Sequence, residues 1–94
     1  MKKKTQITAQ QIILTNGVNA PRMILKGDGD NGPHITFIGD DGVERMTLFC
    51  NDRGPSVVLT DTKGFLRILV YVDSCGPDIL VIDNGGNVAY SLKK

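Results

Sequence analysis

Apolar and polar residues alternate over short stretches of this chain, and glycine-containing turns separate the stretches. Ile35 and Phe37 alternate with Thr36, and Met46 and Leu48 alternate in the same way after the segment 40–42, Asp-Asp-Gly. Period-two alternation on both sides of an Asp-Gly pair is a strong β-hairpin signal. No stretch has a convincing helical period. The pattern therefore predicts short antiparallel strands.

The hairpin pattern repeats along the chain. Gly-Pro pairs stand at 32–33, 54–55 and 76–77, and a glycine follows nine residues after each proline. The stretch from Ala9 fits the same template with one extra residue. We therefore predict one domain, residues 1–94, with repeats of about 22 residues at approximately 9–31, 32–53, 54–75 and 76–94. Residues 1–8 are expected to form a basic tail or a lead-in strand.

Three turns predict one register. Two-residue loops at 41–42, 63–64 and 85–86 would place on one face the pairs Ile35/Leu48, Phe37/Met46, Val57/Val70, Leu59/Ile68, Ile79/Leu92 and Val81/Tyr90. A slip of one residue would scatter these residues over both faces. In the first copy, Leu14 would face Met23 and Ile12 would face Leu25, with a wider loop near Asn16.

The opposite face also carries apolar residues, diluted by threonine and serine. A sheet with one face in water shows a cleaner alternation. We therefore expect an all-β fold of four tandem antiparallel β-hairpin repeats, rolled or stacked as a barrel, prism or solenoid-like array that covers both faces. Another part of the chain or a partner subunit would cover the second face. Its candidate interaction residues are Val58, Leu69, Tyr71, Leu80 and Ile82.

The net charge, the apolar runs and the cysteines of the chain limit the classes of function that the sequence favours. The formal net charge is +1 and no basic face is evident, which does not favour nucleic-acid binding. No apolar run is long enough for a membrane span, and Lys2–Lys4 lead into no secretion signal. The expected location is the cytoplasm or an assembled particle or appendage. Cys50 and Cys75 match neither a disulfide framework nor a zinc motif, so free thiols are expected.

No motif defines a catalytic, cofactor or metal site. The segment Gly27–Gly32 matches a dinucleotide-binding fingerprint, but Pro33 and a strand follow it, where a helix is needed to hold the phosphates. A calcium loop counted from Asp28 has proline at its sixth position and glycine at its twelfth, so it fails. His34 is the single histidine and has no evident catalytic partner. An enzyme is the least favoured class.

Arg22, Arg45 and Arg67 occupy the same template position, so stacked copies would align them. One hypothesis is a column that binds an acidic or sugar ligand. The favoured alternative is hairpin-end chemistry, with arginine stems covering apolar surface and aspartates such as Asp61 and Asp83 bonding to turn amides.

The template reads apolar-x-apolar-x-Asp-x-x-Gly-x-x-Arg-x-x-apolar and is clearest from Val57 to Val70. It resembles a short β-hairpin repeat of uncharacterised bacterial and phage-encoded proteins. The last copy departs from it with Ala89 in the arginine position. The resemblance implies a hairpin array that often accompanies surface or tail-fibre-like assemblies, and it implies no defined activity and no site residues.

These observations predict a non-enzymatic structural or protein-interaction module that self-assembles as a homo-oligomer, with a phage or cell-surface appendage as one setting. The alternative is a lectin-like ligand-binding module that uses the repeated turns. The sequence leaves open whether the further partner is a protein or a glycan.

Overall fold

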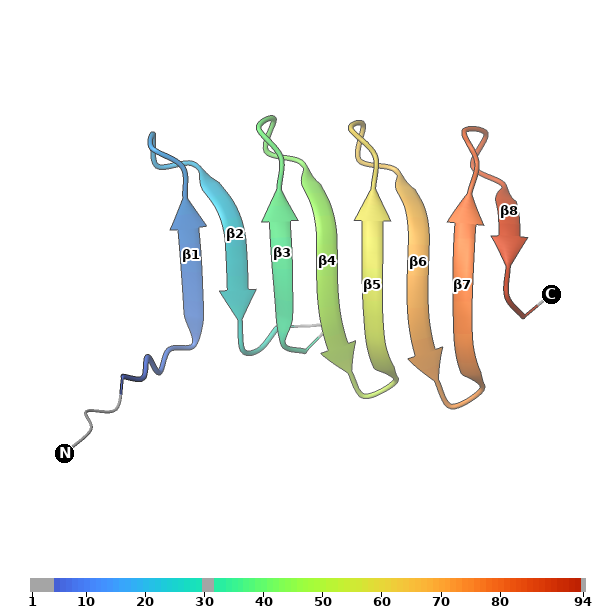
Figure 1. Cartoon of the computed structure of the whole chain (residues 1–94), viewed down its shortest axis with the longest axis horizontal. Coiled ribbons are helices and arrows are strands. Elements are labelled where there is room, and N and C mark those ends of the chain that lie inside the picture. The colour runs from blue at the N-terminus through green and yellow to red at the C-terminus, as the bar shows by residue number, and fades with distance from the viewer. Residues whose placement is uncertain (1–4, 30–31, 94) are drawn as a thin grey trace.

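The computed structural model describes residues 5–29 and 32–93, which form a single antiparallel β-sheet of eight strands (Figure 1). Lys2–Lys4 and the middle of the Gly27–Gly32 segment lie outside the described residues. The strands are β1 (Gln11–Thr15), β2 (Pro21–Lys26), β3 (His34–Ile38), β4 (Glu44–Asn51), β5 (Gly54–Thr60), β6 (Leu66–Asp73), β7 (Gly76–Ile82) and β8 (Val88–Ser91). The described residues include no helix that could cross a membrane.

The spatial order of the strands equals their order in the chain, β1 to β8, so the sheet is a simple meander. This confirms the all-β, antiparallel prediction. The expectation that the single chain rolls or stacks to cover both faces is wrong, because β1 and β8 remain separate edges of an open sheet. Every connection joins neighbouring strands, so no segment crosses over to form a second layer.

The predicted register is confirmed. Phe37 pairs with Met46, and Leu59 pairs with Ile68. The two-residue loops were wrong, because five residues separate Ile38 from Glu44 and the Gly39 amide closes this loop on the Val43 carbonyl. The longer loop keeps the register because a bulge follows it.

The same bulge occurs in the four hairpins β1–β2, β3–β4, β5–β6 and β7–β8, whose turns lie at the top of Figure 1. In each hairpin it leaves one residue of the second strand without a cross-strand partner. These residues are Arg22, Arg45, Arg67 and Ala89. The repeated arginine position is therefore a β-bulge position, and bulges commonly redirect a side chain.

The four upper turns have the same length and hydrogen bonding. Gly64 has a φ of 89°, and its amide bonds to the Asp61 carbonyl. Asn19, with a φ of 72°, fills the corresponding place in the first turn, because asparagine tolerates this left-handed conformation. The loop near Asn16 is therefore no wider than the others. The extra residue of the first copy lies in the loop from Lys26 to His34.

At the lower end of the sheet, neighbouring turns approach closely. A Cβ atom at Gly54 would collide with the Val72 carbonyl oxygen, and Gly54 also has a φ of 132°. The Gly-Pro pairs at 32–33 and 54–55 therefore mark places where one turn packs against a neighbouring strand, which only glycine permits, whereas a Cβ atom at Gly76 would meet no neighbour.

The described residues contain no buried hydrophobic side chain. Among the residues that the structure describes, only Thr36 and Asp78 are buried, with 5% and 4% of their surface exposed. A soluble domain of this size normally buries a contiguous hydrophobic core. This sheet has the apolar residues for a core but has no second layer to enclose them.

Candidate interaction surface

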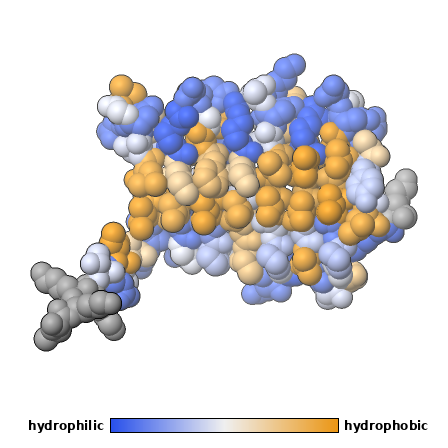
Figure 2. Space-filling model, viewed as in Figure 1, coloured by the Kyte–Doolittle hydropathy of each residue, from blue (hydrophilic) through white to orange (hydrophobic). Residues whose placement is uncertain are grey.

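One face of the sheet is apolar from edge to edge. Cross-strand pairing aligns its side chains in two rows that run across all the strands. The lower row is Ile12, Leu25, Ile35, Leu48, Val57, Val70 and Ile79, continued by Leu92, and the upper row is Leu14, Met23, Phe37, Met46, Leu59, Ile68, Val81 and Tyr90. We call these sixteen residues the continuous apolar face. Figure 2 shows a hydrophobic band across the sheet between hydrophilic ends.

The continuous apolar face is covered only by its own neighbouring side chains. Leu14 and Tyr90 are each 50% exposed at the sheet edges, and the central members are half-buried. A partial third row extends the surface toward the lower turns; its members are Pro33, Cys50, Pro55, Val72 and Pro77. All five of these residues are exposed.

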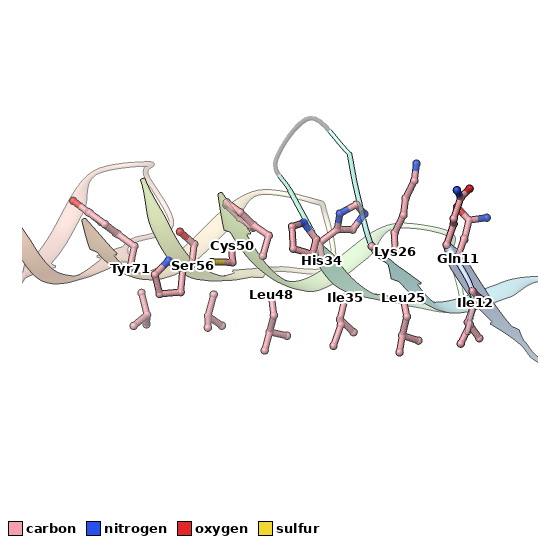
Figure 3. Close-up of a pocket in the computed structure, with 18 of the residues that line it drawn as sticks. Gln11, Ile12, Leu25, Lys26, His34, Ile35, Leu48, Cys50, Ser56 and Tyr71 are labelled. Atoms are coloured by element: carbon pink, nitrogen blue, oxygen red, sulfur yellow. The ribbon is translucent and has the colours of Figure 1, made fainter. Parts of the chain in front are cut away.

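An open hollow of about 630 Å³ lies along the lower part of this region. In Figure 3, Ile12, Leu25 and Ile35 project from one side of the sheet, whereas Lys26 and His34 project from the other. The side of the hollow formed by the lower apolar row is a shallow hydrophobic groove. It can accept apolar side chains but offers no array of polar groups that would orient a small substrate.

The opposite face, which we call the mixed face, changes character along the sheet. Its central row is Ile13, Ile24, Thr36, Thr47, Val58, Leu69, Leu80 and Ser91. The residues proposed from the sequence as an interaction face, Val58, Leu69, Tyr71, Leu80 and Ile82, lie together over β5 to β7. All five are half-buried. Toward β1, the same face presents Lys26 and His34.

Asp78 is the most buried residue of the mixed face, and its carboxylate accepts hydrogen bonds from five groups. Its Oδ1 accepts the Ile79 amide at 2.8 Å, the Leu92 amide at 3.1 Å and the Lys93 amide at 3.3 Å. The Ser91 hydroxyl and the Tyr71 hydroxyl also donate to this carboxylate. Asp78 therefore fastens the end of β8 to β7.

The surroundings of Asp78 shift two pKa values. Burial alone would raise the pKa of Asp78, but the hydrogen bonds from Ile79, Lys93, Tyr71 and Leu92 together lower it. Burial raises the pKa of Tyr71, and the adjacent Asp78 carboxylate raises it further. The cluster is thus an ionised aspartate held by neutral donors, which is a structural arrangement.

The three arginines of the proposed ligand column point along the sheet toward the next upper turn. Arg22 Nε donates to the Ile38 carbonyl at 3.1 Å, and Arg45 donates to the Asp61 carbonyl at 3.3 Å. Arg67 donates to the Asp83 carbonyl. Each of these bonds spans sixteen residues. The column therefore ties each hairpin to the next one.

Each arginine also pairs with a carboxylate. Arg22 pairs with Asp40, Arg45 with Asp41, and Arg67 with Asp61. Ala89 holds the same position in the last hairpin, after which the described chain has no further turn to reach. The departure from the repeat thus falls where the described residues offer an arginine no neighbouring turn of this kind.

The turn aspartates bond to backbone amides of their own loops. Asp61 Oδ1 accepts the Lys63 amide at 2.8 Å and the Phe65 amide at 3.1 Å, and Asp83 makes the equivalent bonds. Burial alone would raise the pKa of Asp61, but these amides and Arg67 together lower it. The Val43 amide and then Arg45 lower the pKa of Asp41.

The structure does not gather the other reactive side chains into a site. Cys50 and Cys75 are free and exposed, and His34 Nδ1 lies 3.0 Å from the Gly32 carbonyl oxygen. Within residues 5–29 and 32–93, no three His, Cys, Asp or Glu side chains are placed to bind a metal ion.

The sequence predicted a fold that covers both faces, so it did not identify the continuous apolar face as an exposed surface. The missed signal was the set of connections. All the strands are joined to their neighbours by short connections, so no described segment between strands is long enough to cover the sheet. Asp78 was also missed, since a single aspartate after a proline has no distinctive sequence signal.

Comparisons with known proteins give no assignment: no family model matches this chain, and neither a curated protein nor a solved structure shows significant similarity to it.

Proposed function

We propose that this protein is a non-enzymatic structural or protein-interaction module that works by self-assembly into a homo-oligomer. The observation that carries the proposal is the absence of any buried hydrophobic side chain among the described residues, on a sheet with sixteen aligned apolar residues. Fully burying one large apolar side chain contributes about 1.5–3 kcal/mol. Covering such a face would therefore supply a large share of the stability of the fold.

The resemblance of the repeat to those of phage-encoded and bacterial proteins adds a setting to this proposal, a phage or cell-surface appendage. The lectin-like alternative has less support. Arg22, Arg45 and Arg67 direct donors to the neighbouring turns, and the shallow groove is apolar. Sugar recognition needs convergent polar groups, and these arginines already direct part of their donors to backbone carbonyls and carboxylates of the sheet.

The test is the absolute mass in solution, measured by size-exclusion chromatography with light scattering over a range of chain concentrations. We expect a discrete mass of two or more chains at micromolar concentration. The mass of one chain throughout that range would contradict the proposed function.

A further inference from the structure

We infer that the continuous apolar face is the assembly surface and that its occupant is the same face of another copy of this chain. This inference rests on the proposed function and deepens it, because it names both the surface and the partner. The mixed face, where the sequence had suggested an interaction, is then not the primary contact.

The continuous apolar face has an area that can be estimated from the geometry of the strands. Eight strands spaced about 4.8 Å apart make the band roughly 38 Å wide. Its two rows and the partial third row of Pro33, Cys50, Pro55, Val72 and Pro77 cover roughly 20 Å along the strands, at about 3.4 Å per residue. The resulting area is close to the about 800 Å² that each partner of a standard stable interface buries. Polar turns lie on both sides of this patch (Figure 2).

The two faces differ in their charged residues. Neither of the two apolar rows contains a lysine, arginine, aspartate or glutamate. Two copies can therefore pack this face against itself without burying like charges, as a self-complementary interface requires. The mixed face would bury Lys26 in the same arrangement, and the burial of a charge that lacks a new partner is costly.

The edges of the sheet, β1 and β8, offer an alternative contact, in which the strands of two chains pair edge to edge. A second chain added beyond β8 would continue the meander, but Ala89 has no guanidinium to reach its first turn. β8 is also the shortest strand, with four residues. Short edges are a common device against edge-to-edge pairing. Assembly through the face needs neither edge.

The test uses two cysteine variants that differ by one position, Val57→Cys and Val58→Cys, each in a Cys50→Ser/Cys75→Ser background. The two residues are neighbours on β5, both are half-buried, and they project from opposite faces. Valine to cysteine is a small change, so both variants should fold. The rate of thiol labelling by a soluble reagent is measured at chain concentrations above and below the assembly range found by light scattering.

We expect labelling at position 57 to slow at least about tenfold on assembly, because an interface core excludes solvent, while labelling at position 58 stays unchanged. An oligomer in which position 58 is protected and position 57 is not would overturn this inference and leave the proposed function standing. Equal labelling of both positions in an oligomer would also overturn it. A single-chain mass at every concentration would overturn the proposed function and this inference with it.

Discussion

The two faces of this sheet are built from alternate residues of the same eight strands, yet they differ in how polar residues are distributed. The continuous apolar face has no charged residue in its two main rows, whereas the mixed face carries Lys26, His34 and the buried Asp78. On the mixed face, polar groups find partners within the chain, as the five hydrogen bonds to Asp78 show. On the other face, no second layer of the described chain packs against the side chains. The buried carboxylate of the mixed face thus finds its partners within one chain, and we propose that the apolar face finds its partner in another copy.

The largest expected effect is on association between copies, when a lysine is placed on one face or the other. Val57→Lys would place an ammonium group in the contact between copies, and burial of an unpaired charge costs several kcal/mol. Since each 1.4 kcal/mol is a factor of ten, we expect association to weaken by about a hundredfold or more. The matched Val58→Lys variant places the same charge on the mixed face and should associate almost as the parent does. Sedimentation over a concentration series measures both, and equal losses would contradict the assignment.

The next largest effect is expected on local stability when Asp78 of the mixed face is replaced. Asp78→Ala removes the acceptor for the amides of Leu92 and Lys93, so the end of β8 should open more often. Amide hydrogen exchange at these two residues should accelerate, and the urea midpoint should fall. Asp78→Asn keeps one acceptor oxygen and should have a smaller effect. Unchanged exchange at Leu92 in the alanine variant would show that Asp78 does not hold β8.

A smaller effect on the stability of the fold is expected from changes in the arginine column, which lies outside both apolar rows. Arg67→Ala removes the bond to the Asp83 carbonyl, and one hydrogen bond contributes about 0.5–1.5 kcal/mol net. Ala89→Arg is the reverse change at the equivalent position of the fourth hairpin and should add almost no stability, because the described residues place no further turn within its reach. Urea unfolding measures both variants. A gain from Ala89→Arg as large as the loss from Arg67→Ala would contradict the clamp between hairpins.

The smallest effect is on pH dependence. The pKa values of Asp41, Asp61 and Asp78 are all lowered from the ordinary 3.8. Their contribution to stability is therefore complete above the unfolded pKa and is lost as the pH falls through the lower folded values. Acid below about pH 3.8 should lower the urea midpoint of the chain. Because the apolar rows hold no carboxyl group, the contact itself should not change over this range. A midpoint that stays flat down to about pH 2 would contradict this.

Much of the local structure could be predicted from the sequence. Alternation at Phe37 and Met46 determined the register, because a one-residue slip would exchange the faces. The loop lengths could not be predicted in this way. A two-residue loop and a five-residue loop followed by a bulge give the same pairing, so the alternation alone does not distinguish them.

The tertiary arrangement was harder to predict for a different reason. Hydrophobic alternation shows that Leu48 and Val57 share a face, but it does not show what covers that face. The roles of Arg45 and Asp78 depend on contacts sixteen and fourteen residues away, which no local pattern encodes. The sequence suggested Val58 and Leu69 as an interaction face because it predicted a fold that covers both faces, but the described residues bury no hydrophobic side chain on either face.

The central claim is that the hydrophobic core of this protein forms between chains. The most direct test is the urea unfolding midpoint of the unmodified protein, measured at chain concentrations that span a roughly hundredfold range, since binding to the folded state stabilises it by mass action. The account predicts that the midpoint rises steadily with concentration. A midpoint that is the same at every concentration would show that the open sheet is stable by itself, and it would contradict the claim.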